Sequence, residues 1–400
     1  MRRIYLDNNA TAPMAPEVFE AMKPYLTTEF GNASSIHWYG QQAKAAVEEA
    51  RESVARLLGA QPGEIVFTSG GTESDNMAIF GAVEAAEPSA SGTPPHVITT
   101  AIEHHAVLYS AKALEARGAH VTWVPVEASG VVDPAEIERA ITPETVLISV
   151  MHANNELGAI QPIEEIGRIA RERGILFHTD AVQSAGKIPI DVNRLNVHLL
   201  SLSAHKLHGP KGVGALYVRR GTSLRPLMYG GHHERDRRPG TENVAGIVGL
   251  GRAADLALPG LEQEAARLAV LRDRLEEGIL RRVPDVTVHA RGSQRLPNTA
   301  SMSFAYTEGE GFVIAADLRG LACSTGAACS SGSLEPSHVL SAIGISKEQA
   351  RSTIRFSLGR FNTPEDIEQG LEIVAQIAEH LRSLSPYFKE AVSAQPSAAG

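Results

Sequence analysis

The sequence predicts an α/β fold in which a large domain is followed by a smaller α+β domain. From about residue 64, short apolar runs alternate with segments whose apolar residues recur at helical spacing. Such alternation is typical of a largely parallel sheet covered by helices. After about residue 285 the order changes to two consecutive strands, a helix, and later one more strand and helix. A chain of 400 residues is long enough for two domains of ordinary size.

The elements of the large domain follow from the spacing of apolar residues. Apolar positions between Ala43 and Leu58 recur at helical spacing, and Gly59 closes this helix. The expected strands are residues 64–68, 96–100, 120–125, 145–150, 175–179, 198–202 and 213–218. Between the fourth and fifth of these, Ile163, Ile166 and Ile169 predict a helix over residues 163–173.

The smaller domain is expected to begin with a long helix. Residues 241–258 and 260–283 predict two helices, and the second is long enough to bridge two domains. Strands at 286–289, 299–304 and 353–358 and helices at 311–319 and 364–383 complete the pattern. The predicted division is an N-terminal arm (1–15) that joins the small domain, a large domain (16–260) and a small domain (261–390). Residues 85–95 are expected to form a surface loop, and the tail at 391–400 is expected to be disordered.

Composition narrows the classes of function. The net charge of −9 and the lack of a long basic run exclude nucleic acid and anionic membranes as expected partners. No apolar stretch approaches the roughly 20 residues of a membrane span, and no apolar signal core follows the N-terminus. The two cysteines, Cys323 and Cys329, give no disulfide framework and favour a reducing compartment, so we expect a cytoplasmic protein. The fifteen histidines show no metal-ligand spacing, which argues against a zinc site.

Two strand-end residues point to pyridoxal phosphate (PLP) chemistry. Asp180 follows the apolar run at 175–179, and Lys206 follows the run at 197–202. A PLP enzyme needs a lysine that binds the cofactor aldehyde and a carboxylate that keeps the pyridine nitrogen protonated. Either residue alone is ambiguous, because Lys211 competes with Lys206 and strand-end acids often cap the next helix.

Two glycine-rich segments add to this pattern. Residues 69–72, Ser-Gly-Gly-Thr, follow a strand and open a helix, where free backbone N–H groups can bind a phosphate. No Gly-Lys-Ser/Thr follows, so this is not a nucleoside-triphosphate loop. Ser203 and His205 could add donors to the same phosphate. Residues 326–332 present Cys329 among glycines and serines, which predicts a mobile thiol-bearing loop at about 322–335. Taken alone, Cys329 could equally be an inert buried thiol, as single cysteines often are.

Ten segments carry a resemblance to a known family. They are YLDNNAT (5–11), GN to H (31–37), FTSGGTE (67–73), IEH (102–104), MHANNELG (151–158), DAVQ (180–183), SAHK (203–206), GTEN (240–243), the run from Cys329 to Leu340, and RFSLGR (355–360). The chain resembles the group I, NifS/IscS-type cysteine desulfurases, which are class V aminotransferase relatives among the PLP enzymes. The segments keep the family's order from residue 4 to about residue 385.

This resemblance implies a fold-type I PLP-dependent transferase that converts L-cysteine to L-alanine. Sulfur would become a persulfide on Cys329 and then pass to an iron–sulfur scaffold or a sulfur-carrier protein. The protein would be a homodimer, and Cys329 could also serve as a transient iron–sulfur ligand shared with a scaffold.

The resemblance also implies a role for each matching residue. Lys206 would hold PLP as a Schiff base and move the Cα proton, with His104 stacked on the ring as an acid/base group. Asp180 would pair with the pyridine nitrogen, and Asn155 and Gln183 would hydrogen-bond the phenolic oxygen. The phosphate would be bound by Gly71, Thr72, Ser203 and His205, with Thr241 reaching in from the second subunit. The substrate would be bound by Arg355, Asn8 and Asn155.

Three positions depart from the family's pattern. Pro239 stiffens the approach to Thr241, Cys323 replaces an aliphatic residue, and the Ser/Ala/Pro tail puts partner docking through the C-terminus in doubt. The alternatives are a selenocysteine lyase or a class V aminotransferase, neither of which needs a nucleophilic cysteine. A nicotinamide-binding oxidoreductase would show Gly-x-Gly-x-x-Gly after its first strand, which this chain lacks. The stretch at 231–235 favours the type of desulfurase that supplies sulfur for nitrogen fixation. Supply of sulfur to general iron–sulfur assembly or to tRNA thiolation remains open.

Overall fold

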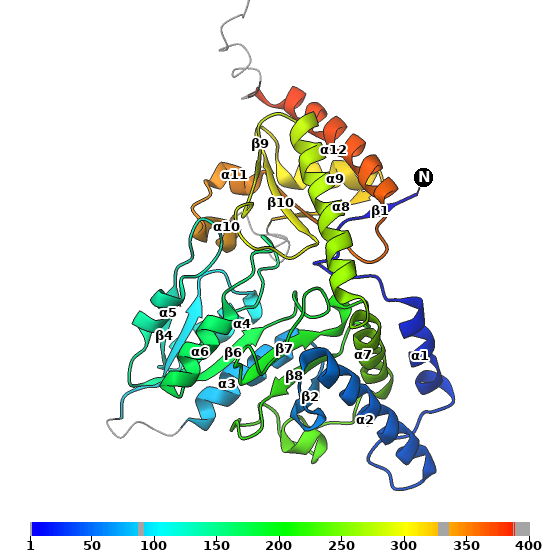
Figure 1. Ribbon diagram of the computed structural model, residues 1–400, viewed down its shortest axis with the longest axis vertical. Helices are drawn as coiled ribbons and strands as arrows, with labels where there is room; N and C mark the ends of the chain where they lie inside the picture. Colours follow the sequence, from blue (N-terminus) through cyan, green and yellow to red (C-terminus); the bar gives the residue numbers. More distant parts are fainter. Residues whose placement is uncertain (1, 87–91, 327–335, 387, 389–400) are drawn as a thin grey trace, which may run out of the picture.

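The computed structural model describes residues 2–86, 92–326, 336–386 and 388. A large sheet with its helices forms one part of the molecule, and a smaller sheet with its own helices lies against it (Figure 1). Helix α8 (Leu261–Arg282) runs from the first part along the second, as its length suggested.

The large sheet has seven strands in the order β2-β8-β7-β6-β5-β3-β4. Their bounds are β2 Ile65–Thr68, β3 His96–Thr100, β4 His120–Val124, β5 Thr145–Ser149, β6 Leu176–Asp180, β7 Leu199–Ser203 and β8 Gly214–Val218. Only β8 runs antiparallel to its neighbours β2 and β7. The other pairs are parallel, so the predicted α/β class with a mostly parallel sheet is confirmed.

The two faces of this sheet are covered by different helices, because successive strand residues point to opposite sides. Ile98 packs into a core with helices α1 (Pro16–Thr27), α2 (Trp38–Leu58), α6 (Ile163–Arg173) and α7 (Val244–Ala257). Its neighbour Val97 packs into a second core with α3 (Gly71–Ala85) and α4 (His105–Ala116). Both faces are therefore apolar, which explains why the strands read as continuous apolar runs.

The smaller part is an antiparallel sheet with the order β12-β13-β10-β9. Its elements are β9 Val286–Val288, β10 Thr299–Phe304, α9 Gly309–Leu318, β12 Ser324–Thr325, α10 His338–Ala342, α11 Lys347–Arg351, β13 Thr353–Ser357 and α12 Pro364–Leu384. The N-terminal β1 (Ile4–Tyr5) pairs in parallel with β11 (Leu321–Ala322), and Ile4 and Leu6 belong to the core of this part. The exact domain boundaries stay predictions.

Several element ends differ from the sequence-based expectation. The helix expected from residue 241 begins at Val244, because the Asn243 side chain caps it by accepting from Gly246 N. The helix expected from residue 311 begins at Gly309, after the capping residue Glu308. The short strands β1, β11 and β12 carry too few residues to show a periodicity. The loop at 85–95, the cysteine loop and the tail lie partly or wholly outside the described residues.

Among the described residues, no single helix is long and apolar enough to cross a membrane. Helices α7 and α8 pass that test only together, as a pair bent by 78°.

A buried ion pair fixes the segment that leads to Thr241. Glu234 lies in the 3-10 helix η3 (His233–Asp236), where Glu234, Arg235 and Asp236 all have positive φ angles (45°, 56° and 65°). Such left-handed backbone is strained for these residues. The Glu234 carboxylate accepts two hydrogen bonds of 2.8 Å from Arg51 of α2 and a third of 2.9 Å from Phe67 N. These contacts offset the strain.

We expect Glu234→Ala to lower the free energy of unfolding by about 3–5 kcal/mol, because it removes the buried counter-charge of the Arg51 guanidinium and leaves only the half-exposed Glu48 carboxylate, 3.2 Å from Arg51 Nε. Urea denaturation monitored by circular dichroism measures this loss. The matched control is Glu172→Ala, which breaks the exposed Arg168–Glu172 pair and is expected to cost less than about 1 kcal/mol. Equal losses in the two variants would contradict the structural role of the buried pair.

Candidate active site

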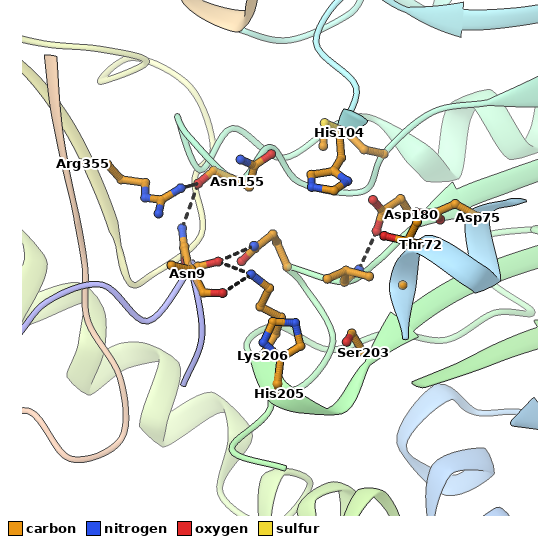
Figure 2. A pocket seen from close by; sticks show the side chains of 15 residues that line it. Asn9, Thr72, Asp75, His104, Asn155, Asp180, Ser203, His205, Lys206 and Arg355 are labelled. Carbon is orange, nitrogen blue, oxygen red and sulfur yellow. Dashed lines mark hydrogen bonds between the residues drawn. The ribbon is translucent and has the colours of Figure 1, made fainter. Parts of the chain in front are cut away.

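A cavity of about 300 Å³ lies at the carboxyl ends of the central strands of the large sheet. Its lining residues are Asn9, Ala10, Gly71, Thr72, Asp75, His104, Met151, Asn155, Asp180, Val182, Gln183, Ser203, His205, Lys206 and Arg355. Figure 2 shows Arg355, Asn155 and Asn9 toward one end and Asp75, Asp180 and Thr72 toward the other, with Lys206 between them. The volume is in the range of small-molecule sites.

Lys206 comes from the short 3-10 helix η2 (Ala204–Lys206), directly after β7. Its Nζ donates to the carbonyl oxygens of Asn9 and, at 2.7 Å, of Ala10. The backbone of the N-terminal segment is held here in turn, because Ala12 N donates to His205 O at 2.8 Å. The N-terminal arm therefore forms one wall of the cavity around the lysine amine.

Of the two adjacent asparagines in that arm, Asn9 lines the cavity and Asn8 does not. Asn9 Nδ2 donates to Asn155 O (3.1 Å) and Thr299 Oγ1 (2.9 Å). Asn8 is buried elsewhere, and its Nδ2 donates to Ser357 O at 2.9 Å. The sequence motif singled out Asn8; only the pairing of the arm with the small domain reveals which of the two neighbours faces the cavity.

Asp180, the last residue of β6, presents a buried carboxylate to the cavity. Its Oδ1 accepts from Val182 N at 2.9 Å. Burial raises the pKa of Asp180 to about 6, while that hydrogen bond and Lys206 oppose the rise. The carboxylate is thus mostly ionised at pH 7 and can pair with a cationic ring nitrogen.

Asp75 is a cavity residue that the sequence analysis did not identify. It lies one turn into α3, four residues after Gly71 and hence on the same helix face. Its Oδ1 is buried, has no hydrogen-bond partner and lies 3.5 Å from His178 Nε2. Burial first, and the Asp180 carboxylate second, raise the pKa of Asp75 well above its usual range. Asp75 therefore adds a second buried carboxyl group, with a raised pKa, beside Asp180.

His104 lies at the N-terminus of α4, where its Nδ1 accepts from Ala106 N at 3.2 Å. Burial, and then the charge of Lys206, lower the pKa of His104 to about 4, so the imidazole is neutral at pH 7. Its neighbour Glu103 accepts from Thr100 Oγ1 and Met151 N, and burial raises the pKa of that carboxyl to about 8. A neutral imidazole can accept a proton, which suits an acid/base group.

One end of the cavity is suited to a phosphate. The first N–H groups of α3, from Gly71 and Thr72, have no acceptor within the helix. A Cβ at Gly71 would lie 2.7 Å from Val182 Cγ2, so only glycine leaves room here. Ser203 and His205 line the same cavity, and burial, followed by Lys206, lowers the pKa of His205 to about 4. His205 would therefore contribute hydrogen bonds rather than charge.

The opposite end presents Arg355, from β13 of the small domain. Its side chain is 1% exposed; Nη1 donates to Asn155 O at 3.1 Å and Nη2 to Asp7 Oδ1 at 2.9 Å. The buried Nε has no hydrogen-bond partner. A guanidinium held from behind in this way is suited to bind a carboxylate at the cavity.

Besides Asn8, two further expected site residues are not placed in this cavity. Thr241 is exposed and is not among the lining residues. Cys329 lies outside the described residues, and so does most of the predicted loop around it. The other cysteine, Cys323, is buried in the core of the small domain, and burial, followed by Asp7, raises the pKa of its thiol to about 12.

The donor set fits PLP. Backbone N–H groups and hydroxyls gather at the α3 end, the ionised Asp180 faces the same cavity, and the Lys206 amine lies between this end and Arg355. These groups match, respectively, a phosphate, a pyridine nitrogen, an aldehyde and the carboxylate of an amino acid. The sequence motifs thus converge on one cavity, although they come from seven separate segments of the chain.

Comparison with known proteins gives a consistent result. The model of the class V aminotransferase family matches residues 4–369. A cysteine desulfurase IscS from Dictyoglomus turgidum is 51% identical over 389 residues, which are 97% of this chain and 98% of the relative. A solved structure titled NifS-like protein has 39% identity and a TM-score of 0.88, and covers 94% of this chain and 100% of its own. A structure titled SspA in complex with cysteine has 40% identity and a TM-score of 0.78, over 90% of this chain and 100% of its own.

Proposed function

We propose a function that starts from the family of this chain, which belongs to the class V aminotransferase family and is a PLP-dependent cysteine desulfurase of the NifS/IscS type. In this proposal the cavity around Lys206 is the active site, and Cys329 receives the sulfur. The observation that carries the assignment is the gathering of Lys206, Asp180 and Arg355 in one cavity.

The residues that would hold PLP are those of the phosphate end and the ring site. Gly71, Thr72, Ser203 and His205 would bind the phosphate, with Thr241 of a second subunit. Asp180 would hold the pyridine nitrogen, His104 would cover the ring, and Asn155 and Gln183 would hydrogen-bond the phenolic oxygen. When bound, PLP supplies the electron-withdrawing ring that makes a Cα proton of an amino acid acidic.

The chain's own residues would then move protons. Lys206, whose Nζ is held by two backbone carbonyls, would take the Cα proton of L-cysteine. His104, neutral at pH 7, would accept the proton of the substrate thiol. Arg355 would fix the substrate carboxylate and so orient its Cα and its sulfur, with Asn155 and Asn9 supporting that end of the site.

Sulfur transfer requires a nucleophilic thiolate. Cys329 would attack the substrate sulfur: a Cys329 S–S bond forms, the substrate Cβ–S bond breaks, and the electron pair of that bond stays with the carbon skeleton. Protonation of this skeleton gives L-alanine, so the thiol is oxidised to a persulfide while the substrate carbon is reduced, and no further oxidant is needed. A free thiol is only a few per cent ionised at pH 7, so a basic neighbour would accelerate this step.

We expect Arg355→Lys to impair turnover despite the retained charge, since one ammonium cannot reproduce the two-point contact of a guanidinium with a carboxylate. It would also lose one of the contacts to Asn155 O and Asp7 Oδ1. The expected signature is a KM for L-cysteine raised by about 10-fold or more, as loss of a charge-assisted hydrogen bond implies. The assay is steady-state alanine formation; an unchanged KM would show that another residue binds the carboxylate.

A homodimer would complete the site, because Thr241 is exposed and does not line the cavity of its own chain. Large apolar side chains are exposed around the same segment and around residues 30–39, including Phe30, Trp38 and Tyr229. We expect these side chains to be buried against a second copy of the chain. Light scattering should therefore give twice the mass of the 42.6 kDa chain.

The sulfur acceptor is proposed to be an iron–sulfur scaffold or a sulfur-carrier protein, with Cys329 as a transient ligand of a shared iron–sulfur cluster. A chain with only two cysteines and no disulfide framework is consistent with the cytoplasm as its compartment.

The function is tested by incubating the PLP-loaded protein with L-cysteine. Alanine is quantified, and alkylated peptides are mapped for persulfide by mass spectrometry. One persulfide on Cys329 for each first-turnover alanine supports the desulfurase mechanism. Activity toward selenocysteine alone, or transamination without a persulfide, would instead support the selenocysteine lyase or the aminotransferase.

A further inference from the structure

Lys187 is a charged side chain beside the cavity for which the proposed mechanism has no use. It follows Gln183 by four residues, in the turn segment after β6. Its Nζ lies 2.9 Å from the backbone oxygen of Gln183 and 3.0 Å from Oε1 of the same residue. One amine thus holds both the backbone and the side chain of Gln183, a residue that lines the cavity.

These contacts fix the orientation of the Gln183 amide. The oxygen of an amide accepts hydrogen bonds, and its NH₂ group donates them. Nε2 of Gln183 lies 3.0 Å from Asn9 O, which is a carbonyl oxygen and can only accept. On the other side, the amine of Lys187 donates to Oε1, and in its protonated form it can only donate. Both neighbours therefore demand the same orientation, with the NH₂ group toward Asn9 and Lys206.

We propose that Lys187 is a positioning residue that keeps the Nε2 donor of Gln183 turned toward Asn9 and Lys206. This inference rests on the proposed function, in which Gln183 hydrogen-bonds the phenolic oxygen of PLP. Without Lys187 the amide is held only by the contact of Nε2 to Asn9 O, so its donor is positioned less firmly. Lys187 itself contacts neither cofactor nor substrate in this arrangement.

A second explanation has to be separated from this one. Burial, and then Lys206 and Arg355, lower the pKa of Lys187 to about 7, so the charge of Lys187 is felt at Lys206. An ammonium that acted through its field alone would affect the cofactor whether or not Gln183 were present. The two explanations therefore differ in one respect: positioning requires the Gln183 amide.

The experiment is a double-mutant cycle with four PLP-loaded proteins: unmodified, Lys187→Met, Gln183→Ala and the double variant. Methionine keeps the length of lysine without a donor, and Lys187→Leu serves the same comparison if the methionine variant does not fold. The first readout is the apparent pKa of the cofactor chromophore from an absorbance titration. The second is the PLP affinity of the apoprotein. Neither readout depends on turnover.

Lys187→Met is expected to raise the chromophore pKa by about 0.5–1 unit, the equivalent of one lost hydrogen bond. A phenolic oxygen without its donor holds the chromophore's proton more tightly. PLP affinity should fall by about 3- to 10-fold. In the Gln183→Ala background, Lys187→Met should change neither quantity further. The control Lys211→Met removes an exposed lysine charge near His205 and should leave the chromophore unchanged.

Equal shifts from Lys187→Met in both backgrounds would overturn the proposal in favour of a direct field effect. So would a comparable shift in Lys211→Met, or no shift in any variant. An unchanged chromophore in Gln183→Ala would refute the role of Gln183 and this inference with it. Alanine formation from L-cysteine by the unmodified protein reports separately on the desulfurase function.

Discussion

Lys206→Ala is expected to yield a folded protein that retains no covalent cofactor and has no measurable turnover. Two functions disappear with the amine: the bond to the aldehyde of PLP and the group that moves the Cα proton. General acid–base catalysis alone contributes about 10²–10⁴-fold to a rate. We expect little penalty in stability, because the hydrogen bonds of Lys206 Nζ to Asn9 O and Ala10 O end on backbone oxygens, so that losing these hydrogen bonds leaves no buried charge unpaired.

The measurement combines desalting, absorbance and borohydride reduction followed by peptide mapping. The unmodified protein should carry the reduced adduct on Lys206, and Lys206→Ala should carry none. Lys211→Ala is the matched control, because Lys211 is an exposed lysine five residues away and outside the cavity lining. A reduced adduct on Lys211 would overturn the assignment of the cofactor lysine.

Cys329→Ser is expected to abolish alanine and persulfide formation, whereas Cys323→Ala should retain most activity. The serine hydroxyl cannot form a persulfide, so the step that cleaves the Cβ–S bond is lost. Cys323 belongs to the small-domain core, and its thiol, with a pKa of about 12, is almost entirely un-ionised at neutral pH. Its replacement by alanine is expected to cost only about 1 kcal/mol of stability.

Persulfide mapping after incubation with L-cysteine distinguishes the two thiols. In Cys329→Ser, addition of L-cysteine should still change the cofactor absorbance, because Lys206 and Arg355 are intact. That spectral change is the internal control for a loaded, substrate-binding site. A persulfide on Cys323, or alanine production that survives in Cys329→Ser, would rule out the proposed sulfur transfer.

The paired strand ends show how the sequence led to the active site. Asp180 and Ser203 terminate β6 and β7, two neighbouring parallel strands, so their ends meet at one edge of the sheet. Each strand is an apolar run ended by a polar residue, which is a local property that can be read directly. The family resemblance then predicted which polar residues matter, and the cavity lining contains most of them.

Asp75 and Asn9 line the cavity, but the sequence did not identify either of them. Asp75 lies in α3 beyond the glycine-rich turn that the sequence pointed to, and only the approach of α3 to β6 brings its carboxyl near Asp180. Asn8 and Asn9 are adjacent, so their side chains point in different directions, and a sequence cannot tell which one faces a distant partner. The hydrogen bonds of Asn8 to Ser357 and of Asn9 to Thr299 decide it.

The sequence by itself therefore determined the fold class, the order of the main strands and helices, and the identity of the residues that matched the family. Periodicity and strand-end chemistry depend only on residues that are close together in the chain, so they can be recognised in the sequence alone. Only the tertiary structure decided that Arg355 and Asn9 join Lys206 in one cavity, that Cys323 is buried, and that Lys187 holds Gln183. These facts depend on contacts between segments far apart in the chain or on desolvation, and no short-range pattern encodes either.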